Sequence, residues 1–224
     1  MRVLLITDSL GCPRPEIDVK HTWTNKILSK YSNKVEVYTY CYPGLSADDI
    51  NINYVKFLKP DLIVLQVGVV DACRRALSRN ELFVIRHIPI IKRLVGHFCK
   101  KWHYTITKIR NVHYLSEEKF KNIILKIKEE TNAHMLFISI APAGKGLTSK
   151  VYNVSGDIVK YNDAVQDIVG LKILNPYTEC VDKYILSDGH HLNIKGNLDV
   201  FCAVDAAIET YLQEKMCIGY DSGL

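Results

Sequence analysis

The chain begins with Arg2-Val3-Leu4-Leu5-Ile6-Thr7, a short apolar run that is followed at once by Asp8-Ser9-Leu10-Gly11. A run of this length, bounded by turn residues, is typical of a buried strand. In an open sheet of parallel strands, the residue just after a strand lies at the carboxyl edge, where ligands bind. The stretch therefore predicts a strand that places the hydroxyl of Ser9 at that edge.

Four further apolar runs alternate with longer segments of helical periodicity. The other expected strands are residues 34–40, 61–67, 133–140 and 171–174. The expected helices are residues 16–31, 46–58, 78–110, 116–131, 155–169 and 194–215. This alternation predicts an α/β protein, a three-layer α/β/α sandwich around a five-stranded, mostly parallel sheet. Because no linker or repeat interrupts it, we expect a single domain over residues 1–224, with a helical insertion at about 78–115.

The composition is that of an ordinary globular protein, with 224 residues, 48% apolar side chains and 24% charged ones. Disorder, collagen and solenoid architectures do not fit these values. No run of about 18 apolar residues is present, and the N-terminus lacks the pattern of a signal peptide. The seven cysteines are scattered and contain no C-x-x-C pair, which predicts reduced thiols and a cytoplasmic location.

Two segments carry candidate catalytic residues. Ser9 follows the first strand, and Asp188 stands three residues before His191, just ahead of the last expected helix. An Asp at this spacing can accept a hydrogen bond from the imidazole Nδ1–H, which leaves Nε2 free to take a proton from a serine hydroxyl. Asn193 is expected to cap the last helix and hold the loop. Each segment alone is also compatible with a plain turn. No third ligand cluster is evident, so we expect no metal and no organic cofactor.

Four blocks in this order resemble the SGNH (GDSL-type) hydrolase family, in particular members from bacterial surface-polysaccharide gene clusters. The blocks are Asp8-Ser9-Leu10-Gly11, Gly44, Gly68-Val69-Val70-Asp71 and Asp188-x-x-His191. The resemblance covers essentially the whole chain. It implies that Ser9 is the nucleophile, that His191 is the general base and then the acid, and that Asp188 orients His191. It also implies that the backbone N–H groups of Ser9 and Gly44 form an oxyanion hole, and that acyl esters are cleaved through an acyl-enzyme.

One position departs from the family pattern. The family has an Asn in the third block, whose side chain is a third oxyanion donor, but this chain has Val70 there. Loss of one such donor typically costs about a hundredfold in turnover. Either another group substitutes, with Gln66, Asp71 and the two arginines Arg74 and Arg75 as candidates, or the activity is modest.

Five residues are candidates for substrate binding: Asp8, Asp71, Arg74, Arg75 and His190. An arginine at this edge of the sheet is suited to hold an anionic substrate or the oxyanion. Adjacent arginines after a strand are also commonly just solvated, and that alternative stays open.

The net charge of +5 is concentrated in one segment. Between Leu82 and Ser116 there are seven basic residues and no acidic one, which leaves −2 for the rest of the chain. Apolar residues recur there at helical spacing: Val84, Ile88, Ile91, Val95, Phe98 and Trp102. Pro89 interrupts the pattern, so we expect two helical pieces. The apolar stripe either packs on the sheet or belongs to a lid that meets an anionic partner. Nucleic acid is not expected, since no recognition motif is present and a pI near 8.7 is too low.

These observations predict a serine esterase that hydrolyses acyl esters, in the first place acetyl esters, on a carbohydrate or glycolipid. The alternatives are an O-acyltransferase acting on a surface polysaccharide, and a catalytically weakened module that binds glycan or membrane. The expected partners are the acylated substrate and, through residues 82–116, an anionic glycan or the inner face of a membrane.

Overall fold

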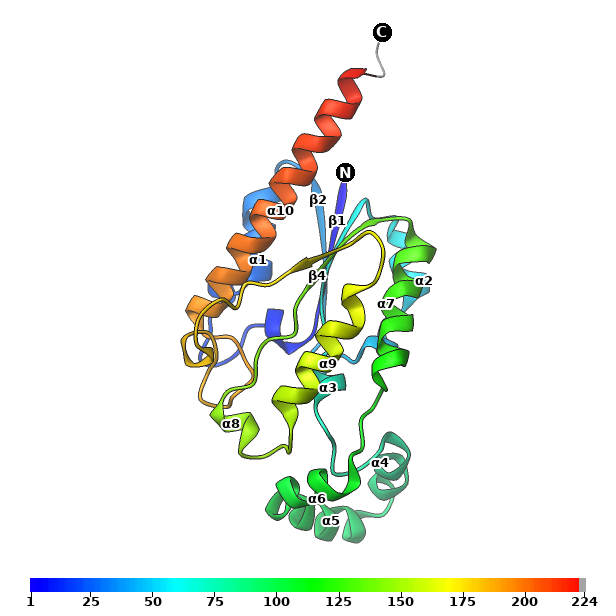
Figure 1. Ribbon diagram of the computed structural model, residues 1–224, viewed down its shortest axis with the longest axis vertical. Coiled ribbons are helices and arrows are strands. Elements are labelled where there is room, and N and C mark those ends of the chain that lie inside the picture. Colours follow the sequence, from blue (N-terminus) through cyan, green and yellow to red (C-terminus); the bar gives the residue numbers. More distant parts are fainter. Residues whose placement is uncertain (222–224) are drawn as a thin grey trace.

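A computed structural model describes residues 1–221 and contains a single five-stranded sheet at its centre (Figure 1). The strands are β1 (Arg2–Thr7), β2 (Glu36–Cys41), β3 (Leu62–Gln66), β4 (His134–Ile138) and β5 (Leu171–Leu174). Their order across the sheet is β2-β1-β3-β4-β5, and every pair is parallel. The predicted α/β sandwich is confirmed, with a sheet that is parallel throughout.

Helices cover both faces of the sheet. The ten α-helices of the described chain are α1 (Trp23–Tyr31), α2 (Ile52–Leu58), α3 (Val69–Ala72), α4 (Arg79–Arg86), α5 (Pro89–Lys101), α6 (His103–Arg110), α7 (Glu117–Thr131), α8 (Lys145–Thr148), α9 (Val154–Gln166) and α10 (Ile194–Asp221). Four short 3₁₀ helices complete it: η1 (Ser9–Gly11), η2 (Val19–His21), η3 (Ala47–Asp49) and η4 (Val181–Lys183). Helices α1 and α10 lie on one face, and α2, α7 and α9 lie on the other (Figure 1). None of the described helices combines the length and apolar character needed to cross a bilayer.

The period of the strand explains the two hydrophobic cores. Successive side chains of a strand point to opposite faces, so Val3 and Leu5 pack toward α1 and α10, whereas Leu4 and Ile6 pack toward α2, α7 and α9. Because both faces are covered by helices, the whole run is apolar instead of alternating. This is why residues 2–7 could be recognised as a strand from sequence alone.

Several predicted helix boundaries differ from those observed. The helix expected from residue 16 begins at Trp23, because the Thr22 hydroxyl accepts a hydrogen bond from Asn25 N–H and caps it there. The segment 46–58 divides into η3 and α2, since Asn51 caps the second piece. The final helix continues beyond residue 215 to Asp221.

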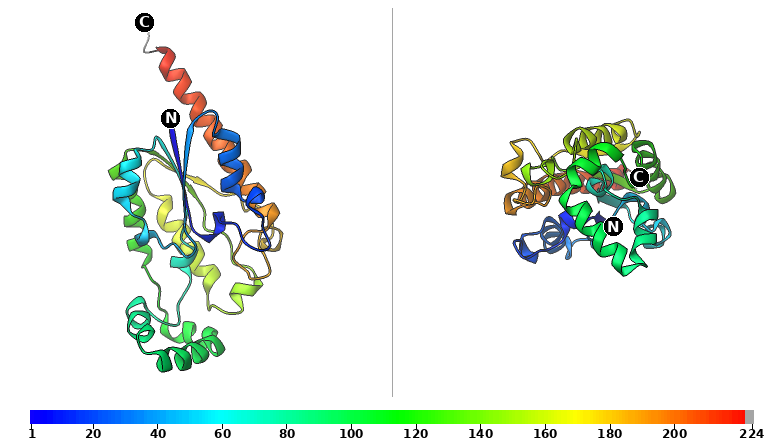
Figure 2. Two further views of the ribbon diagram at one scale, coloured as in Figure 1. Left: turned by 180° about the vertical axis from the view of Figure 1, so that it is seen from behind. Right: turned by 90° about the horizontal axis from the view of Figure 1, so that it is seen from below.

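The insertion consists of three helices, α4, α5 and α6, where the sequence predicted two. Pro89 occupies the first turn of α5, as expected, and a further break at Trp102 separates α5 from α6. The three helices lie past the carboxyl ends of the strands, and Figure 2 shows them across that end of the molecule. Neither α4 nor α5 contains a buried residue. The alternative in which their apolar stripe packs on the sheet is therefore wrong.

Candidate active site

Ser9 is placed by the end of β1. Asp8 caps η1, because its Oδ1 accepts a hydrogen bond of 2.9 Å from the backbone N–H of Leu10. Asp8 itself is fully buried, and this burial raises the pKa of its carboxyl to about 7. The short 3₁₀ turn directs the chain away from the sheet immediately after Ser9, which leaves the Ser9 side chain at the carboxyl edge.

The loop that carries His191 is held by hydrogen bonds at both of its ends. Asp188 Oδ1 accepts from the backbone N–H groups of His190 and His191, each at 3.1 Å. Asn193 caps α10, as the sequence predicted, because its Oδ1 accepts from Gly196 N–H at 2.9 Å. These bonds fix Asp188 and His191 on the same side of one turn.

A glycine lets this loop lie directly against α8. Gly189 has φ +89°, and a Cβ added to it would lie 2.1 Å from the backbone nitrogen of Leu147. Its carbonyl accepts a 2.8 Å hydrogen bond from Gly144 N–H. Any side chain at position 189 would force the loop and α8 apart, so the close contact requires glycine.

Ser9, His191 and Asp188 form a hydrogen-bonded chain. His191 Nδ1 lies 2.6 Å from Asp188 Oδ2, and His191 Nε2 lies 3.0 Å from Ser9 Oγ. The carboxylate accepts from Nδ1–H, which leaves the Nε2 lone pair facing the serine hydroxyl. The arrangement allows the imidazole to take a proton from Ser9 Oγ as that oxygen attacks a carbonyl carbon.

The electrostatics suit a base that is neutral near pH 7. Partial burial lowers the pKa of His191, and the nearby charges of His190 and Arg14 lower it further, although the hydrogen bond with Asp188 opposes them. For Asp188, partial burial opposes ionisation, but the hydrogen bonds from His191 and from two backbone N–H groups hold its pKa well below the usual range. Asp188 is therefore an anion next to a neutral His191.

Two backbone N–H groups are available beside Ser9. Gly44 has φ +78°, a conformation that favours glycine, and it lines the same cavity as Ser9 and His191. Within the described residues, neither Ser9 N–H nor Gly44 N–H has a hydrogen-bond acceptor. Both are thus free to donate to a ligand oxygen.

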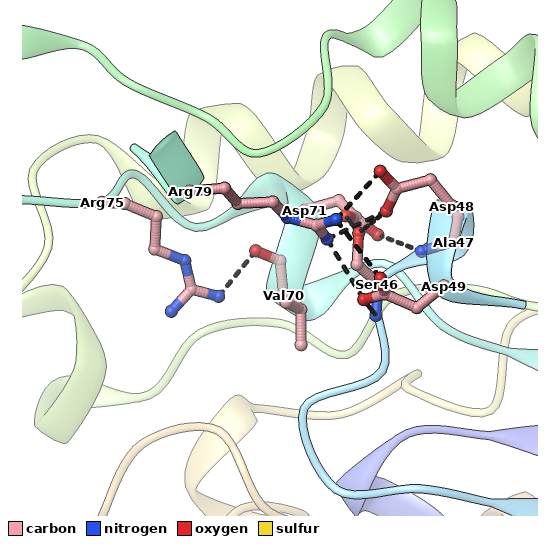
Figure 3. A network of polar contacts seen from close by, with 8 residues as sticks. All are labelled: Ser46, Ala47, Asp48, Asp49, Val70, Asp71, Arg75 and Arg79. Carbon is pink, nitrogen blue, oxygen red and sulfur yellow. Dashed lines mark hydrogen bonds and ion pairs between the residues drawn. The ribbon is translucent and has the colours of Figure 1, made fainter. Parts of the chain in front are cut away.

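Asp71 on α3 joins the segment after β3 to the segment after β2 (Figure 3). Its carboxylate accepts from the hydroxyl of Ser46 and from Ala47 N–H, the latter at 3.1 Å. Burial raises the pKa of Asp71 to about 6. The carboxyl group thus braces the segment that contains Gly44 against the segment that contains Val70.

Three of the residues predicted to bind substrate have structural partners instead. Asp8 and Asp71 are both fully buried and do not line the cavity. Arg74 reaches the cavity wall, but its Nε and Nη2 donate to the two carboxylate oxygens of Asp157 at 2.6 and 3.1 Å. Gln66, considered as an oxyanion donor, lies inside β3, where its Oε1 accepts from Trp23 Nε1 at 2.7 Å.

The other two predicted residues, Arg75 and His190, do line the cavity. Arg75 stands next to Val70, because its Nη2 donates a 2.6 Å hydrogen bond to the Val70 carbonyl (Figure 3). Its guanidinium also stacks over the ring of Tyr114, 4.8 Å from the centroid. Val70, which stands where the SGNH pattern has Asn, is thus directly adjacent to a cation.

The cavity beside Ser9 has a volume of about 990 Å³. Its wall includes Arg14, Lys100, His103, Tyr114 and Lys150, none of which the sequence analysis singled out as part of a site. These residues come from loops and from the insertion, far apart in the sequence. No spacing in the sequence could have identified them, since only folding brings them together.

One group of side chains has a geometry compatible with a metal ion. Among the described residues, Asp188, His190 and His191 offer ligand atoms that all lie within 4.8 Å of one another. Two of these residues are already engaged in the chain to Ser9, where Asp188 Oδ2 faces His191 Nδ1. The possible metal ligands thus include the two side chains that form the hydrogen-bonded chain with Ser9.

Sequence comparison finds no matching family model and no curated relative. Solved structures do match. An acetyl xylan esterase is 17% identical with a TM-score of 0.61, over 93% of this chain and all of that one. A GDSL-like lipase from Bacteroides thetaiotaomicron is 13% identical with a TM-score of 0.60, over 94% of this chain and 88% of that one. A carbohydrate acetylesterase from Sinorhizobium meliloti is 14% identical with a TM-score of 0.59, over 94% and 99%.

The fold is that of the GDSL-type hydrolases. The likeness extends over almost the full length of these structures, so the resemblance seen in the four sequence blocks agrees with the whole architecture. In a fold shared by many proteins, activity depends on the site and not on the scaffold. The chemistry of this chain therefore depends on Ser9 and its neighbours.

Proposed function

We propose that the protein is a serine esterase of SGNH type that hydrolyses acyl esters, in the first place acetyl esters, on a carbohydrate or glycolipid. The observation that carries this proposal is the chain of hydrogen bonds from Ser9 through His191 to Asp188 at the wall of a large cavity. Acetyl xylan esterases and a carbohydrate acetylesterase among the similar structures support the substrate class.

In the first half of the reaction, Ser9 Oγ forms a bond to the ester carbonyl carbon while its proton passes to His191 Nε2. Asp188 stabilises the imidazolium that results. When the tetrahedral intermediate collapses, the bond to the alkoxy oxygen breaks and His191 returns the proton to that oxygen. The sugar hydroxyl leaves, and the acyl group stays on Ser9.

In the second half, a water molecule attacks the acyl-enzyme while His191 accepts its proton. Collapse of the second tetrahedral intermediate breaks the bond to Ser9 Oγ, which recovers its proton from His191. The products are a carboxylic acid and the free enzyme. Among the groups of the protein, Ser9 and His191 exchange protons in these two steps, and Asp188 stabilises the imidazolium. The proposed reaction uses no cofactor.

The negative oxygen of each intermediate would be bound by the free N–H groups of Ser9 and Gly44. Val70 supplies no third donor, and the neighbouring Arg75 already uses one nitrogen on the Val70 carbonyl. A single missing donor typically reduces turnover by a factor of about 10²–10³. We accordingly expect a working but slow esterase on simple esters.

A fluorophosphonate probe and 4-nitrophenyl acetate test this proposal together. The unmodified protein should hydrolyse the ester and be labelled at Ser9, as located by peptide mass spectrometry, whereas Ser9→Ala should do neither. Absence of turnover and of labelling in the unmodified protein would contradict the esterase. Transfer of the acetyl group to an added glycan in preference to water would identify an O-acyltransferase.

We also propose that the insertion contacts an anionic membrane surface. Along α5, Ile90, Leu94 and Phe98 form one apolar face and are 76%, 67% and 58% exposed. The cationic residues of this helix are Lys92, Arg93, Lys100 and Lys101, and the segment 82–116 has no acidic residue. An exposed apolar face flanked by cations is the pattern of a helix that lies in a lipid interface. Two such faces on copies of this chain would repel each other, which favours lipid over self-association.

Sedimentation with vesicles tests this contact. We expect binding to phosphatidylglycerol vesicles, weak binding to phosphatidylcholine vesicles, and a loss of about tenfold or more in Phe98→Ser. The control is Phe57→Ser on α2, since Phe57 is 78% exposed but lies outside the insertion. Equal binding of both vesicle types, or a dimer by light scattering that Phe98→Ser dissociates, would contradict the membrane contact.

A further inference from the structure

The cavity beside Ser9 has an unusual charge distribution. Five cationic side chains contribute to its wall: Arg14, Arg74, Arg75, Lys100 and Lys150. No Asp or Glu of the described chain lines it. Because like charges repel strongly where solvent is partly excluded, such a grouping is stabilised when an anion enters the cavity.

The charge of Arg74 is already neutralised inside the protein. Its bidentate pair with Asp157 is buried, with side-chain exposures of 10% and 2%. His113 lies on the same carboxylate, 3.4 Å from Asp157 Oδ2. Arg74 therefore shapes the wall, and the excess of positive charge comes from the other four residues.

The remaining cations have little or no internal compensation. Arg75, Lys100 and Lys150 form no ion pair with any described residue. Arg14 has a single contact, 3.7 Å from Glu16, whose side chain is 61% exposed. A contact at that distance between a solvated acid and a cation contributes little. The four charges thus remain available to a ligand.

Arg75 also has an unused donor. Its Nη2 donates to the Val70 carbonyl, and stacking of the guanidinium on the ring of Tyr114 restrains the guanidinium plane. Its Nε is buried and has no hydrogen-bond partner among the described residues. A buried donor without an acceptor is costly, and a ligand oxygen in the cavity would remove that cost.

The positive charges lie close to the reacting groups. The charge of Arg14 depresses the pKa of His191, and those of Arg14 and Lys150 depress the pKa of His190, in both cases after the larger effect of burial. Lys100 brings the insertion to the wall of the same cavity. An anion bound by these residues would lie in the same cavity as the ester bond.

The cavity is much larger than an acetyl group needs. Its volume of about 990 Å³ is at the upper end of ordinary small-molecule sites. The wall also includes apolar side chains, among them Val69, Leu147 and Val151. There is room for the acyl group next to Ser9 and for a sugar that carries a charged substituent.

We propose that the ester substrate carries an anionic group, a carboxylate or a phosphate, which binds beside Ser9 to the four available cations, Arg14, Arg75, Lys100 and Lys150. The role of the group as part of an ester substrate rests on the proposed esterase function, but the anion site itself rests on the cavity. Guanidinium groups bind both anions through paired N–H donors. Glucuronate and glucose 6-phosphate represent the two sources of charge, and glucose is their neutral counterpart.

Binding to the Ser9→Ala variant tests the site without turnover. By titration calorimetry at low salt, we expect glucuronate, glucose 6-phosphate or both to bind at least about tenfold more tightly than glucose, with the difference shrinking as salt is added. A preference for one anion identifies the carboxylate or the phosphate as the natural group. Equal affinity for all three sugars would overturn the proposal.

Neighbouring lysines on α5 and in the cavity provide matched variants. Lys150→Gln and Lys100→Gln should each weaken anion binding severalfold, whereas Lys101→Gln should not, because Lys101 does not line the cavity. An equal loss of anion affinity in Lys101→Gln would show that the net charge of the protein, and not a defined site, causes the binding.

Failure of this inference and failure of the proposed function give different results. If Ser9 is labelled and 4-nitrophenyl acetate is hydrolysed, yet glucose binds as tightly as the anions, the esterase stands and the anion site is wrong. If the anions bind selectively but no ester is turned over and Ser9 is not labelled, the site stands and the esterase is wrong.

Discussion

The carboxyl edge of the sheet and the helical insertion face the same cavity, yet different forces hold them in place. Ser9, Gly44 and His191 are positioned by strands and loops that contribute apolar residues to two buried cores. The helices α4, α5 and α6 of the insertion have no buried apolar residue, and the polar Thr107 is their single buried side chain.

Polar contacts fasten the insertion to the rest of the molecule. Arg79 pairs with Asp48 and Asp49, at 2.9 and 3.1 Å, and Arg110 donates to the carbonyl of Ala76 at 2.8 Å. Exposed pairs of this kind contribute only about 0–1 kcal/mol each. The residues at the sheet edge are thus held in a fixed geometry by buried cores, as chemistry requires. The apolar residues of α4 and α5 in the insertion stay at the surface.

The largest effect on turnover should come from His191, which lies between Ser9 and Asp188. We expect His191→Ala to reduce turnover of 4-nitrophenyl acetate by about 10³–10⁴-fold, because Ser9 would lose its base. The neighbouring His190→Gln should cost less than about tenfold, since His190 makes no hydrogen bond to Ser9. Steady-state kinetics compare the two. Similar losses in both variants would show that sheet-edge geometry does not single out His191.

The same substitution in the two regions should have unequal effects on stability. Phe120 on α7 is fully buried, and Phe98 on α5 is 58% exposed. Phe120→Ala should lower the free energy of unfolding by about 3–5 kcal/mol, whereas Phe98→Ala should change it by about 0.5 kcal/mol or less. Urea denaturation followed by circular dichroism measures both. A large loss in Phe98→Ala would mean that the insertion has a core of its own.

Adjacent arginines provide the next comparison, because one is structural and the other faces the cavity. Arg74→Met should lower the free energy of unfolding by about 3 kcal/mol, since it leaves the buried carboxylate of Asp157 without its cation. Arg75→Met should leave stability nearly unchanged and weaken anion binding. Thermal denaturation and calorimetry separate the two roles. A stable Arg74→Met protein with impaired anion binding would assign Arg74 to the substrate after all.

The smallest effect concerns the charge that the cavity imposes on the triad. His191 must be neutral to act as a base, so activity falls as pH drops through its pKa, which burial and then the charges of His190 and Arg14 lower. Removal of one cation in Arg14→Gln makes protonation easier and raises that pKa. The acid limb of the kcat/KM profile for 4-nitrophenyl acetate should therefore move upward by a few tenths of a pH unit. An unchanged limb, or one moved downward, would place Arg14 too far from His191 to act on it.

The strands and the pairing of Asp188 with His191 were predictable because both have local signals. Within residues 2–7, Val3 to Ile6 form a continuous apolar run. The hydrogen bond between Asp188 and His191 follows from a spacing of three residues within one turn. The boundaries of helices were less predictable. The helical periodicity extends back to residue 16, but the cap at Thr22 makes the helix begin at Trp23. For Asp8 and Asp71, position next to a strand end suggested contact with substrate, but burial and capping bonds decided otherwise.

The sequence by itself determined the α/β architecture, the identity of Ser9, His191 and Asp188 as a candidate triad, and the concentration of positive charge after the third strand. The architecture and the charge follow from apolar periodicity and charge counting, which are local properties of the chain, and the candidate triad follows from the order of four sequence blocks that resemble the SGNH family. Only the tertiary structure decided that Arg74 pairs with Asp157 while Arg75 faces the cavity, and that Arg14, Lys100 and Lys150 lie around Ser9. Which charges are neutralised depends on contacts between residues far apart in sequence, and those contacts exist only once the two cores have formed.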